Sequence, residues 1–304
     1  MKITIEERED VGTRIDLFLM TRLKDISRKN LKYLVMGGFI KVNDEVVRPN
    51  YKAKFNDVIE YSEDEVSKAL GKAKPTTMKP RKMNLDIIYE DENTLILNKP
   101  SGINVHSVKR NENNALLNGV LDYLKDTNSR ARLVHRLDRD TSGVLLVSKS
   151  YEAHNFYSLQ FERRTTRKRY VAVVEGNPFE KDEYLNNEVI RLSTYMSKSN
   201  NPGDKRYVNT KSKRGKAAIT EVRFRDTFEF GRIKCSVLNL EPKTGRTHQL
   251  RVHLSSIGNP ILGDELYGGR HYRRLMLHAY SLKFILYGSD DVIEAIADIP
   301  KDFS

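Results

Sequence analysis

Residues 135–143 read H-R-L-D-R-D-T-S-G and run directly into the apolar segment Val144–Val147. Fixing charged side chains beside a buried strand is costly unless the charges are paired or used in chemistry. The Thr-Ser-Gly after Asp138 and Asp140 is typical of a turn. Taken alone, the stretch fits an ion-paired surface loop as well as it fits a catalytic site built on Asp138.

Composition indicates a basic protein with a polyanionic partner. The chain has 304 residues, enough for about two domains, and its 53 Lys and Arg against 41 Asp and Glu give a net charge of +12. Such an excess favours a partner rich in phosphate, although a generally basic soluble protein is the alternative. The single cysteine, Cys235, excludes an internal disulfide and favours a reducing compartment. The N-terminus lacks the apolar core of a signal peptide, and no apolar run approaches the roughly 18 residues of a membrane span, so we expect a cytoplasmic protein without membrane contact.

The first 66 residues predict a small α/β domain. Residues 14–19 begin a short helix, and Ser27 is placed to cap a second helix that carries Leu31, Leu34 and Val35 on one face and ends at Gly37-Gly38. Residues 39–42 and 46–47 predict a hairpin around the turn Asn43-Asp44, and residues 58–61 predict a further strand.

The second predicted helix begins with three cations, Arg28, Lys29 and Lys32. They form either a solvated basic face or a phosphate-contacting face, and we favour phosphate because helix N-termini and clustered cations both attract it. Residues 12–62, with R-x-D-x-F-L and S-R-K-x-L-K-Y-L-V-x-G-G-F-I-K-V-N, resemble the S4-type RNA-binding domain. The resemblance implies RNA binding and names no reaction.

The rest of the chain predicts a linker and a larger α+β domain. Residues 67–84 are rich in small, basic and Pro residues and read as a flexible basic linker. Residues 85–304 predict a catalytic domain built on a mixed, mainly antiparallel sheet. Its expected parts are a hairpin at 85–90 and 95–98, helices at 117–124 and 151–164, and strands at 144–147, 169–174, 217–224, 233–240 and 247–254. In the last of these strands, Leu250 and Val252 would share the face opposite Arg251 and His253. Residues 177–215 are polar and give no confident element.

The sequence lacks the motifs of zinc hydrolysis, cysteine catalysis and phosphate-loop chemistry. The sequence holds no H-E-x-x-H, no cysteine cluster and no phosphate-binding G-x-x-x-x-G-K-S/T loop, and Cys235 sits in a strand-like run as a small core residue. We therefore expect carboxylate chemistry on Asp138, with nearby cations and a phenol. Tyr170, considered alone, reads as an ordinary strand aromatic.

Five ordered blocks resemble the RluA-type RNA pseudouridine synthases. They are L-I-L-N-K-P-S-G-I-N-V-H, H-R-L-D-R-D-T-S-G-V-L-L-V-S-K, K-R-Y-V-A-V-V-E-G, P-K-T-G-R-T-H-Q-L-R-V-H-L and I-L-G-D-E-L-Y-G. The resemblance implies an isomerase that breaks the N-glycosidic bond of a uridine in RNA, turns the uracil and joins its C5 to the ribose, without a cofactor or a metal. A domain order of S4-type module followed by catalytic domain also occurs among bacterial members of that family.

The resemblance also implies roles for individual residues. Asp138 would be the essential carboxylate, Tyr170 would stack on the uracil and assist proton removal from C5, and Arg251 would pair with Asp138, with Arg246 as the second candidate for that pairing. Substrate-binding roles fall to Arg136, which would help displace the flipped base, and to Arg246 and Lys99, together with the cations of the first domain. Asp140 becomes a structural turn residue.

Two other functions stay open at this point. A non-catalytic RNA-binding or ribosome-assembly protein would have no need for Asp138 among cations, and a glycosylase would release free uracil. The substrate is expected to be ribosomal or transfer RNA, and the protein is expected to be a monomer without an obligate protein partner. Burying the base in a pocket that excludes water would prevent hydrolysis from competing with isomerisation.

Overall fold

The computed structural model describes residues 1–23, 26, 28–72, 79–107, 114–127, 129, 131–198, 206–209, 215–231 and 233–303. These residues divide into two compact units, Met1–Thr77 and Met78–Ser304. Each unit has a hydrophobic core of its own. No helix in the described ranges combines the length and the apolar character needed to cross a membrane.

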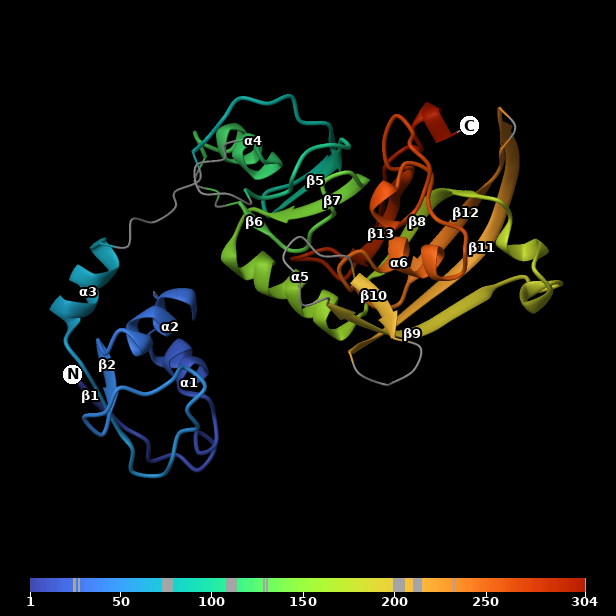
Figure 1. Cartoon of the computed structure of the whole chain (residues 1–304). Helices are drawn as coiled ribbons and strands as arrows, with labels where there is room; N and C mark the ends of the chain where they lie inside the picture. Colours follow the sequence, from blue (N-terminus) through green and yellow to red (C-terminus); the bar gives the residue numbers. More distant parts are fainter. Residues whose placement is uncertain are drawn as a thin grey trace. The chain divides into compact units, whose positions relative to one another are not determined.

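The first unit packs two helices on a small antiparallel sheet. Its elements are β1 (Lys2–Thr4), α1 (Ile15–Arg22), α2 (Arg28–Met36), β2 (Ile40–Val42), β3 (Val58–Tyr61) and α3 (Glu63–Lys72). The strand order is β1-β3-β2. Figure 1 draws this unit in blue to cyan, with α1, α2 and α3 labelled. Leu31, Leu34 and Val35 of α2 are buried, as the helical spacing predicts. Both predicted helices and the strand at 58–61 are confirmed; Ser27, the expected cap, lies outside the described residues.

Two predictions in this unit are wrong. Residues 46–47 form no strand, because β2 pairs with β3 instead and the turn at Asn43-Asp44 closes only a single bridge from Val42 to Glu45. Helix α3 occupies residues 67–72, where we expected linker. Val66 and Ala69 anchor this helix in the core of the first unit. The apolar surface of these two residues is enough to order a segment whose composition looked like linker.

The second unit is built on one large sheet. Its strands are β4 (Ile87–Glu90), β5 (Thr94–Lys99), β6 (Arg132–Leu133), β7 (Ser142–Ser148), β8 (Arg167–Glu175), β9 (Ile190–Lys198), β10 (Arg206–Asn209), β11 (Lys216–Phe230), β12 (Ile233–Pro242), β13 (Leu277–Ile285) and β14 (Val292–Ile296). The order is β10-β9-β11-β12-β8-β13-β7-β5-β4, with β6 beside β7 and β14 beside β13. The mixed, mainly antiparallel sheet is as predicted, and strands β9 and β10 lie within residues 177–215, for which we predicted no element.

The centre of this sheet depends on one glycine. Among the described strand pairs, β7 and β13 run parallel and all others run antiparallel. The parallel pairing joins Ser142 and Gly143 to His278 and Ala279. Gly143 has φ +112°, and a Cβ at this position would lie 2.2 Å from the Ala279 carbonyl oxygen. Only glycine permits this approach, so Gly143 allows the two halves of the sheet to join directly after the H-R-L-D loop.

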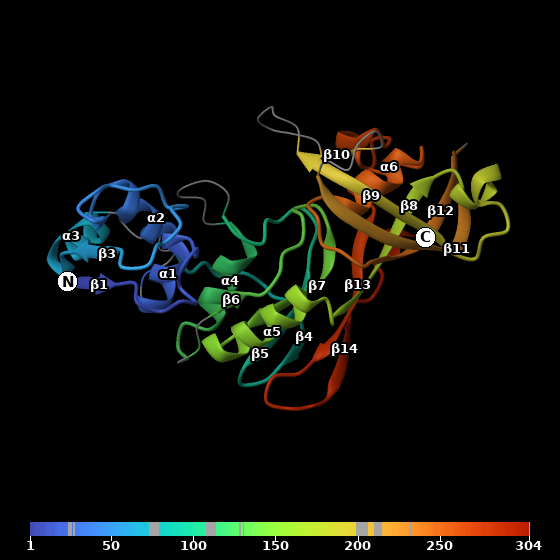
Figure 2. The same ribbon diagram turned by 90° about the horizontal axis from the view of Figure 1, so that it is seen from below.

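Three helices flank the sheet: α4 (Leu116–Tyr123), α5 (Tyr151–Arg163) and α6 (Gln249–Ser256). Helix α5 packs against β6 and β7, and α6 packs against β10, β11 and β12 (Figure 2). The helices predicted near 117–124 and 151–164 are confirmed. The strand predicted at 247–254 is wrong, because residues 249–256 form α6 and Gln249–Leu254 are all buried. The residues alternate as a strand does, but the pattern misleads here because the polar side chains are buried as well.

Candidate active site

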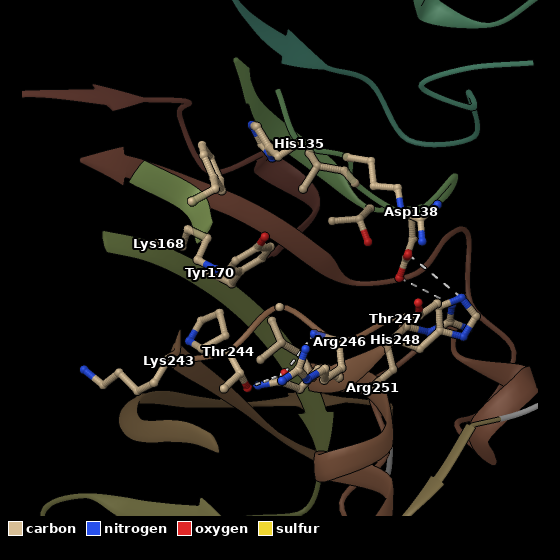
Figure 3. Close-up of a pocket in the computed structure, with 18 of the residues that line it drawn as sticks. His135, Asp138, Lys168, Tyr170, Lys243, Thr244, Arg246, Thr247, His248 and Arg251 are labelled. Atoms are coloured by element: carbon tan, nitrogen blue, oxygen red, sulfur yellow. Dashed lines mark hydrogen bonds and ion pairs between the residues drawn. The ribbon is translucent and has the colours of Figure 1, made fainter. Parts of the chain in front are cut away.

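A cavity of about 470 Å³ opens in the second unit. Its lining comes from residues 134–138 and 141 before β7, residues 161, 162 and 164 at the end of α5, residues 168 and 170 of β8, residues 242–251 from the end of β12 to the start of α6, and residue 277 of β13. Figure 3 shows Asp138, Tyr170 and Arg251 around this cavity, each from a different segment. The fold therefore gathers the three residues that the sequence assigned to catalysis.

Asp138 lies on the loop between β6 and β7, and its side chain is 30% exposed. The turn after β5 holds this loop through two hydrogen bonds. The backbone N–H of Gly102 donates to the Arg139 carbonyl at 3.0 Å, and the Ser101 hydroxyl donates to the Asp140 carbonyl at 2.7 Å. Asp140 itself is half exposed and faces Arg139, in keeping with a turn residue. These contacts fix the backbone from which Asp138 projects.

Lys99 supports the same loop and does not line the cavity, which corrects its assignment to substrate binding. Its side chain is fully buried. The ammonium donates to the carbonyl oxygens of Pro100 at 2.8 Å, Ile103 at 2.9 Å and Arg139 at 2.8 Å. Burial lowers the pKa of Lys99 to about 8, although nearby carboxylates act in the opposite direction. Because its ammonium donates three hydrogen bonds to backbone carbonyls, Lys99 positions the loop that carries Asp138.

His135 holds the other end of the loop. Its Nε2 accepts a hydrogen bond from the backbone N–H of Leu146 at 3.0 Å, and its ring stacks on Phe161 with centroids 4.8 Å apart. Burial, with a smaller contribution from the positive charge of Lys168, lowers the pKa of His135 to about 3. The ring is therefore neutral at physiological pH, with its proton on Nδ1.

The start of α6 is shaped by Gln249. His248, just before it, has a left-handed backbone with φ 57°. The Gln249 side-chain oxygen accepts from the Thr244 hydroxyl at 2.7 Å and from the Arg246 backbone N–H at 3.1 Å, while its amide donates to the Ile219 carbonyl at 2.9 Å. A buried amide satisfied on both sides fixes the turn rigidly. The turn presents His248 and Arg251 to the cavity.

Arg251 is the arginine that approaches Asp138. Its Nη1 lies 3.9 Å from Asp138 Oδ2, whereas its Nε and Nη2 donate to Asp264 at 2.8 and 2.6 Å. Arg246, the other candidate, donates through Nε to the Ala217 carbonyl. Burial alone would lower the pKa of Arg251, but the hydrogen bonds and charge of Asp264, together with the charge of Asp138, hold it above its ordinary value. Arg251 therefore stays charged although it is almost buried.

Two aromatic groups complete the surroundings of Asp138. His248 Nε2 lies 3.9 Å from Asp138 Oδ1, and His248 Nδ1 forms a hydrogen bond with the Tyr267 hydroxyl at 2.9 Å. The Arg251 guanidinium lies over the Tyr267 ring, 5.0 Å from its centroid. Tyr267 thus fixes both groups that face the carboxylate.

Tyr170 projects from β8 into the cavity (Figure 3). In the described part of the chain its hydroxyl has no hydrogen-bond partner. Burial, and then the negative charge of Asp138, raise the pKa of Tyr170 well above its usual value. The phenol is neutral at physiological pH, and its oxygen is left for a ligand in the cavity.

The cavity also carries cations without a carboxylate partner. Within the described residues, no carboxylate lies at ion-pair distance from Arg136, Arg164, Lys168 or Arg246, all of which line it. By contrast, Lys243 in the same lining pairs with Glu221 and Glu241. Unpaired cations around a carboxylate are suited to a substrate that brings its own negative charges.

The sequence did not single out Asp264, His248 or Tyr267. All three stand in quoted blocks, P-K-T-G-R-T-H-Q-L-R-V-H-L and I-L-G-D-E-L-Y-G, but nothing in their spacing shows that they meet. Arg28, Lys29 and Lys32 lie on α2 of the first unit. No three His, Cys, Asp or Glu side chains of the described residues converge as a metal site would require.

Comparison with known proteins decides the family. Residues 93–256 match the model of the RNA pseudouridylate synthase family, and residues 13–59 match the S4 domain. The chain belongs to the RNA pseudouridylate synthase family. A "ribosomal large subunit pseudouridine synthase C" of Escherichia coli is 34% identical to it over 98% of the chain and 93% of that protein. A "ribosomal large subunit pseudouridine synthase D" of Borreliella burgdorferi is 33% identical over 99% of the chain and 90% of that protein.

Solved structures agree with this membership. Human RNA pseudouridylate synthase domain containing 1 matches with a TM-score of 0.60 and 26% identity, over 73% of the chain and 86% of that structure. Human RNA pseudouridylate synthase domain containing 4 shares the fold, with a TM-score of 0.56. The chain is therefore an RNA pseudouridine synthase, which isomerises uridine to pseudouridine in RNA. Its S4 domain precedes the synthase region. The RNA-binding and isomerase functions implied by the sequence motifs are confirmed.

Proposed function

We propose that Asp138 is the essential carboxylate of this synthase, that Arg251 orients it, and that the target is a uridine of large-subunit ribosomal RNA. One observation supports the catalytic assignment above the others. Asp138 faces the cavity with Arg251 Nη1 3.9 Å away, while Asp264 fixes the rest of the guanidinium. A carboxylate that is kept ionised by a held counter-charge can stabilise or capture the positive charge that develops on the sugar when a glycosidic bond breaks.

In the proposed reaction, Asp138 meets the positive charge that develops on the ribose as the N1–C1′ bond breaks. The uracil turns within the cavity, and its C5 forms the new bond to C1′. The proton on C5 is then lost, and N1 ends the reaction protonated, so the product has the same atoms as the substrate. No electrons enter or leave the system.

Tyr170 is proposed to stack on the uracil while the base is detached and to assist removal of the C5 proton. Its neutral phenol offers an oxygen with no competing partner among the described residues. Arg136 is exposed beside the cavity and carries no carboxylate partner in the described ranges. We propose that Arg136 takes the place of the extruded base, which offsets part of the few kcal/mol that unstacking costs.

The choice of RNA rests on the relatives. The relatives described above are named for the large ribosomal subunit and are matched over both units of the chain. The first unit, with Arg28, Lys29 and Lys32 on α2, is proposed to bind the phosphate backbone of the same RNA. We also propose that the protein acts as a monomer, because Asp138, Tyr170 and Arg251 come from one chain and need no second copy to meet, and that it acts in the cytoplasm together with its proposed RNA substrate.

The test uses large-subunit ribosomal RNA from a strain lacking the protein, labelled with tritium at uridine C5. Wild-type protein should release label and create pseudouridine at a mappable position, whereas Asp138→Asn should release none. Asp140→Asn is the matched control, because Asp140 lies on the same loop and is half exposed. Equal release by Asp138→Asn and wild type would overturn the catalytic assignment. Release only from transfer RNA would overturn the choice of substrate.

A further inference from the structure

A buried carboxylate in the first unit collects three cations. Asp16, in the first turn of α1, has no exposed surface. It accepts hydrogen bonds from Arg14 Nε at 3.0 Å, Arg14 Nη2 at 3.2 Å and Arg28 Nε at 3.1 Å, and Lys32 Nζ lies 3.9 Å away. Burial raises the pKa of Asp16, but the hydrogen bonds from Arg14 and Arg28 outweigh it and bring the pKa below its ordinary value. Asp16 is therefore charged at neutral pH.

The three cations face outward from this buried centre. The side chains of Arg14, Arg28 and Lys32 are 41%, 43% and 44% exposed, against none for Asp16. Three positive charges against one negative charge leave the cluster with a positive excess. In the described residues Arg28 uses only Nε for hydrogen bonding, so its outer N–H groups point to no protein acceptor. The carboxylate holds the inner edges of the cations and leaves their outer edges to solvent.

We propose that Asp16 gathers Arg14, Arg28 and Lys32 into a binding site for a backbone phosphate of RNA. The inference rests on the proposed RNA-binding role of the first unit, and it adds Arg14 as a ligand and Asp16 as a positioning residue. Long cationic side chains lose conformational freedom when they bind phosphate. A buried carboxylate that already orders them removes part of this cost before the RNA arrives.

The proposal makes a prediction opposite in sign to simple electrostatics. Removing a negative charge from a basic surface strengthens RNA binding if the charge only repels phosphate. If Asp16 orders the site, its loss scatters the cations and binding weakens. The sign of the change therefore separates the two possibilities.

The experiment compares Asp16→Asn with Asp57→Asn in the full-length protein. Asp57 is also buried in the first unit, but its partners are neutral: Asn43 Nδ2 at 2.8 Å, the Tyr51 hydroxyl at 2.9 Å and the Lys54 backbone N–H at 2.8 Å. Asp57→Asn therefore matches the loss of a buried charge without freeing cations. Binding of a fluorescent stem-loop RNA is measured between 50 and 300 mM KCl.

We expect Asp16→Asn to bind the RNA roughly 5- to 10-fold more weakly, with a salt dependence reduced by about one to two phosphate contacts. Asp57→Asn should stay within about twofold of wild type. On RNA substrate, Asp16→Asn should raise KM and leave kcat unchanged at saturation. Equal or tighter binding by Asp16→Asn overturns the inference.

A second variant keeps the test decisive if Asp16→Asn unfolds the first unit. Arg14→Gln leaves Asp16 paired with Arg28 and should lower the salt dependence by about one contact. An unchanged slope in Arg14→Gln also overturns the inference. If the combined variant Arg28→Gln, Lys29→Gln and Lys32→Gln keeps the wild-type slope, the proposed RNA-binding role of the first unit fails instead.

Discussion

Asp264 holds Arg251 by two hydrogen bonds, from Nε at 2.8 Å and from Nη2 at 2.6 Å, so that Nη1 is the nitrogen that approaches Asp138. Asp264 has only 1% of its surface exposed. Removing one partner of a buried ion pair leaves the other charge uncompensated, which costs about 3–5 kcal/mol. The orientation of the arginine that faces Asp138 therefore depends on a residue that does not itself line the cavity.

The first prediction concerns this pair. Asp264→Asn should lower the free energy of unfolding by about 3 kcal/mol and reduce kcat at least tenfold at temperatures where the variant remains folded. Urea unfolding and tritium release measure the two effects. Glu265→Gln is the control, since the neighbouring Glu265 side chain is 64% exposed and should tolerate the change. A fully active Asp264→Asn enzyme would show that Arg251 needs no anchor.

The second prediction separates two tyrosines. Tyr170→Phe should leave stability within about 0.5 kcal/mol of wild type, because its hydroxyl has no partner in the described structure, and should lower kcat on the order of 100-fold. Tyr157→Phe should do the reverse. Its buried hydroxyl contacts the Thr94 hydroxyl at 2.7 Å and the Tyr287 N–H at 3.1 Å, so its loss costs about 1–2 kcal/mol and spares kcat. Unchanged kcat in Tyr170→Phe would restrict Tyr170 to stacking.

The third prediction concerns acid stability. The pKa of His135 is about 3 in the folded state, against an ordinary value of 6.5. Between these values the unfolded chain binds a proton that the folded protein does not, so stability falls as pH falls through this window. At pH 5.0 the protein should have lost about 2 kcal/mol of its free energy of unfolding through His135, relative to pH 7.5.

Urea unfolding at pH 7.5 and pH 5.0 measures this contribution. His135→Gln should lose about 2 kcal/mol less than wild type over the interval. A wild-type slope in His135→Gln would assign the acid sensitivity to other groups, of which buried His253, with a pKa of about 4, is the first to examine.

The fourth prediction concerns Lys168, which lines the cavity without a carboxylate partner in the described ranges. Burial, with a smaller effect of Arg164, lowers its pKa. A phosphate of bound RNA would supply the missing counter-charge. Lys168→Met should weaken RNA binding roughly 10-fold and reduce the salt slope by about one, and Lys168→Arg should restore most of the affinity. Lys234→Met, whose ammonium is already paired with Glu180, should bind as wild type does.

The sequence motifs located the cavity but not its internal supports. Asp138, Tyr170 and Arg251 were singled out because each stands in a recognisable block, and all three line one cavity. Asp264 was not found, since its pairing with Arg251 depends on a turn thirteen residues away whose shape no local pattern reveals. Lys99 was misassigned for a related reason: a lysine in a conspicuous motif reads as a ligand for substrate until its burial is known.

The prediction of secondary structure was wrong where polar residues are buried. Residues 247–254 alternate as a strand does, yet Arg251 and His253 lie inside the protein because Asp264, Thr194 and Thr220 satisfy them. Periodicity assumes that polar side chains face water. The end of helix α3 was predicted as linker for a different reason: only a few apolar residues anchor the helix, so its composition resembles that of a linker.

The ammonium of Lys99, bound to the carbonyls of Pro100, Ile103 and Arg139, serves where many proteins use a bound metal ion to tie loops together. Because this cation is covalently attached to the chain, neither a chelator nor dilution can remove it, as they can remove a bound metal ion. Because it is shielded from solvent, salt that disrupts RNA binding leaves it untouched. We therefore expect the contacts of Lys99 with the loop of Asp138 to persist at ionic strengths that weaken contacts with RNA phosphates.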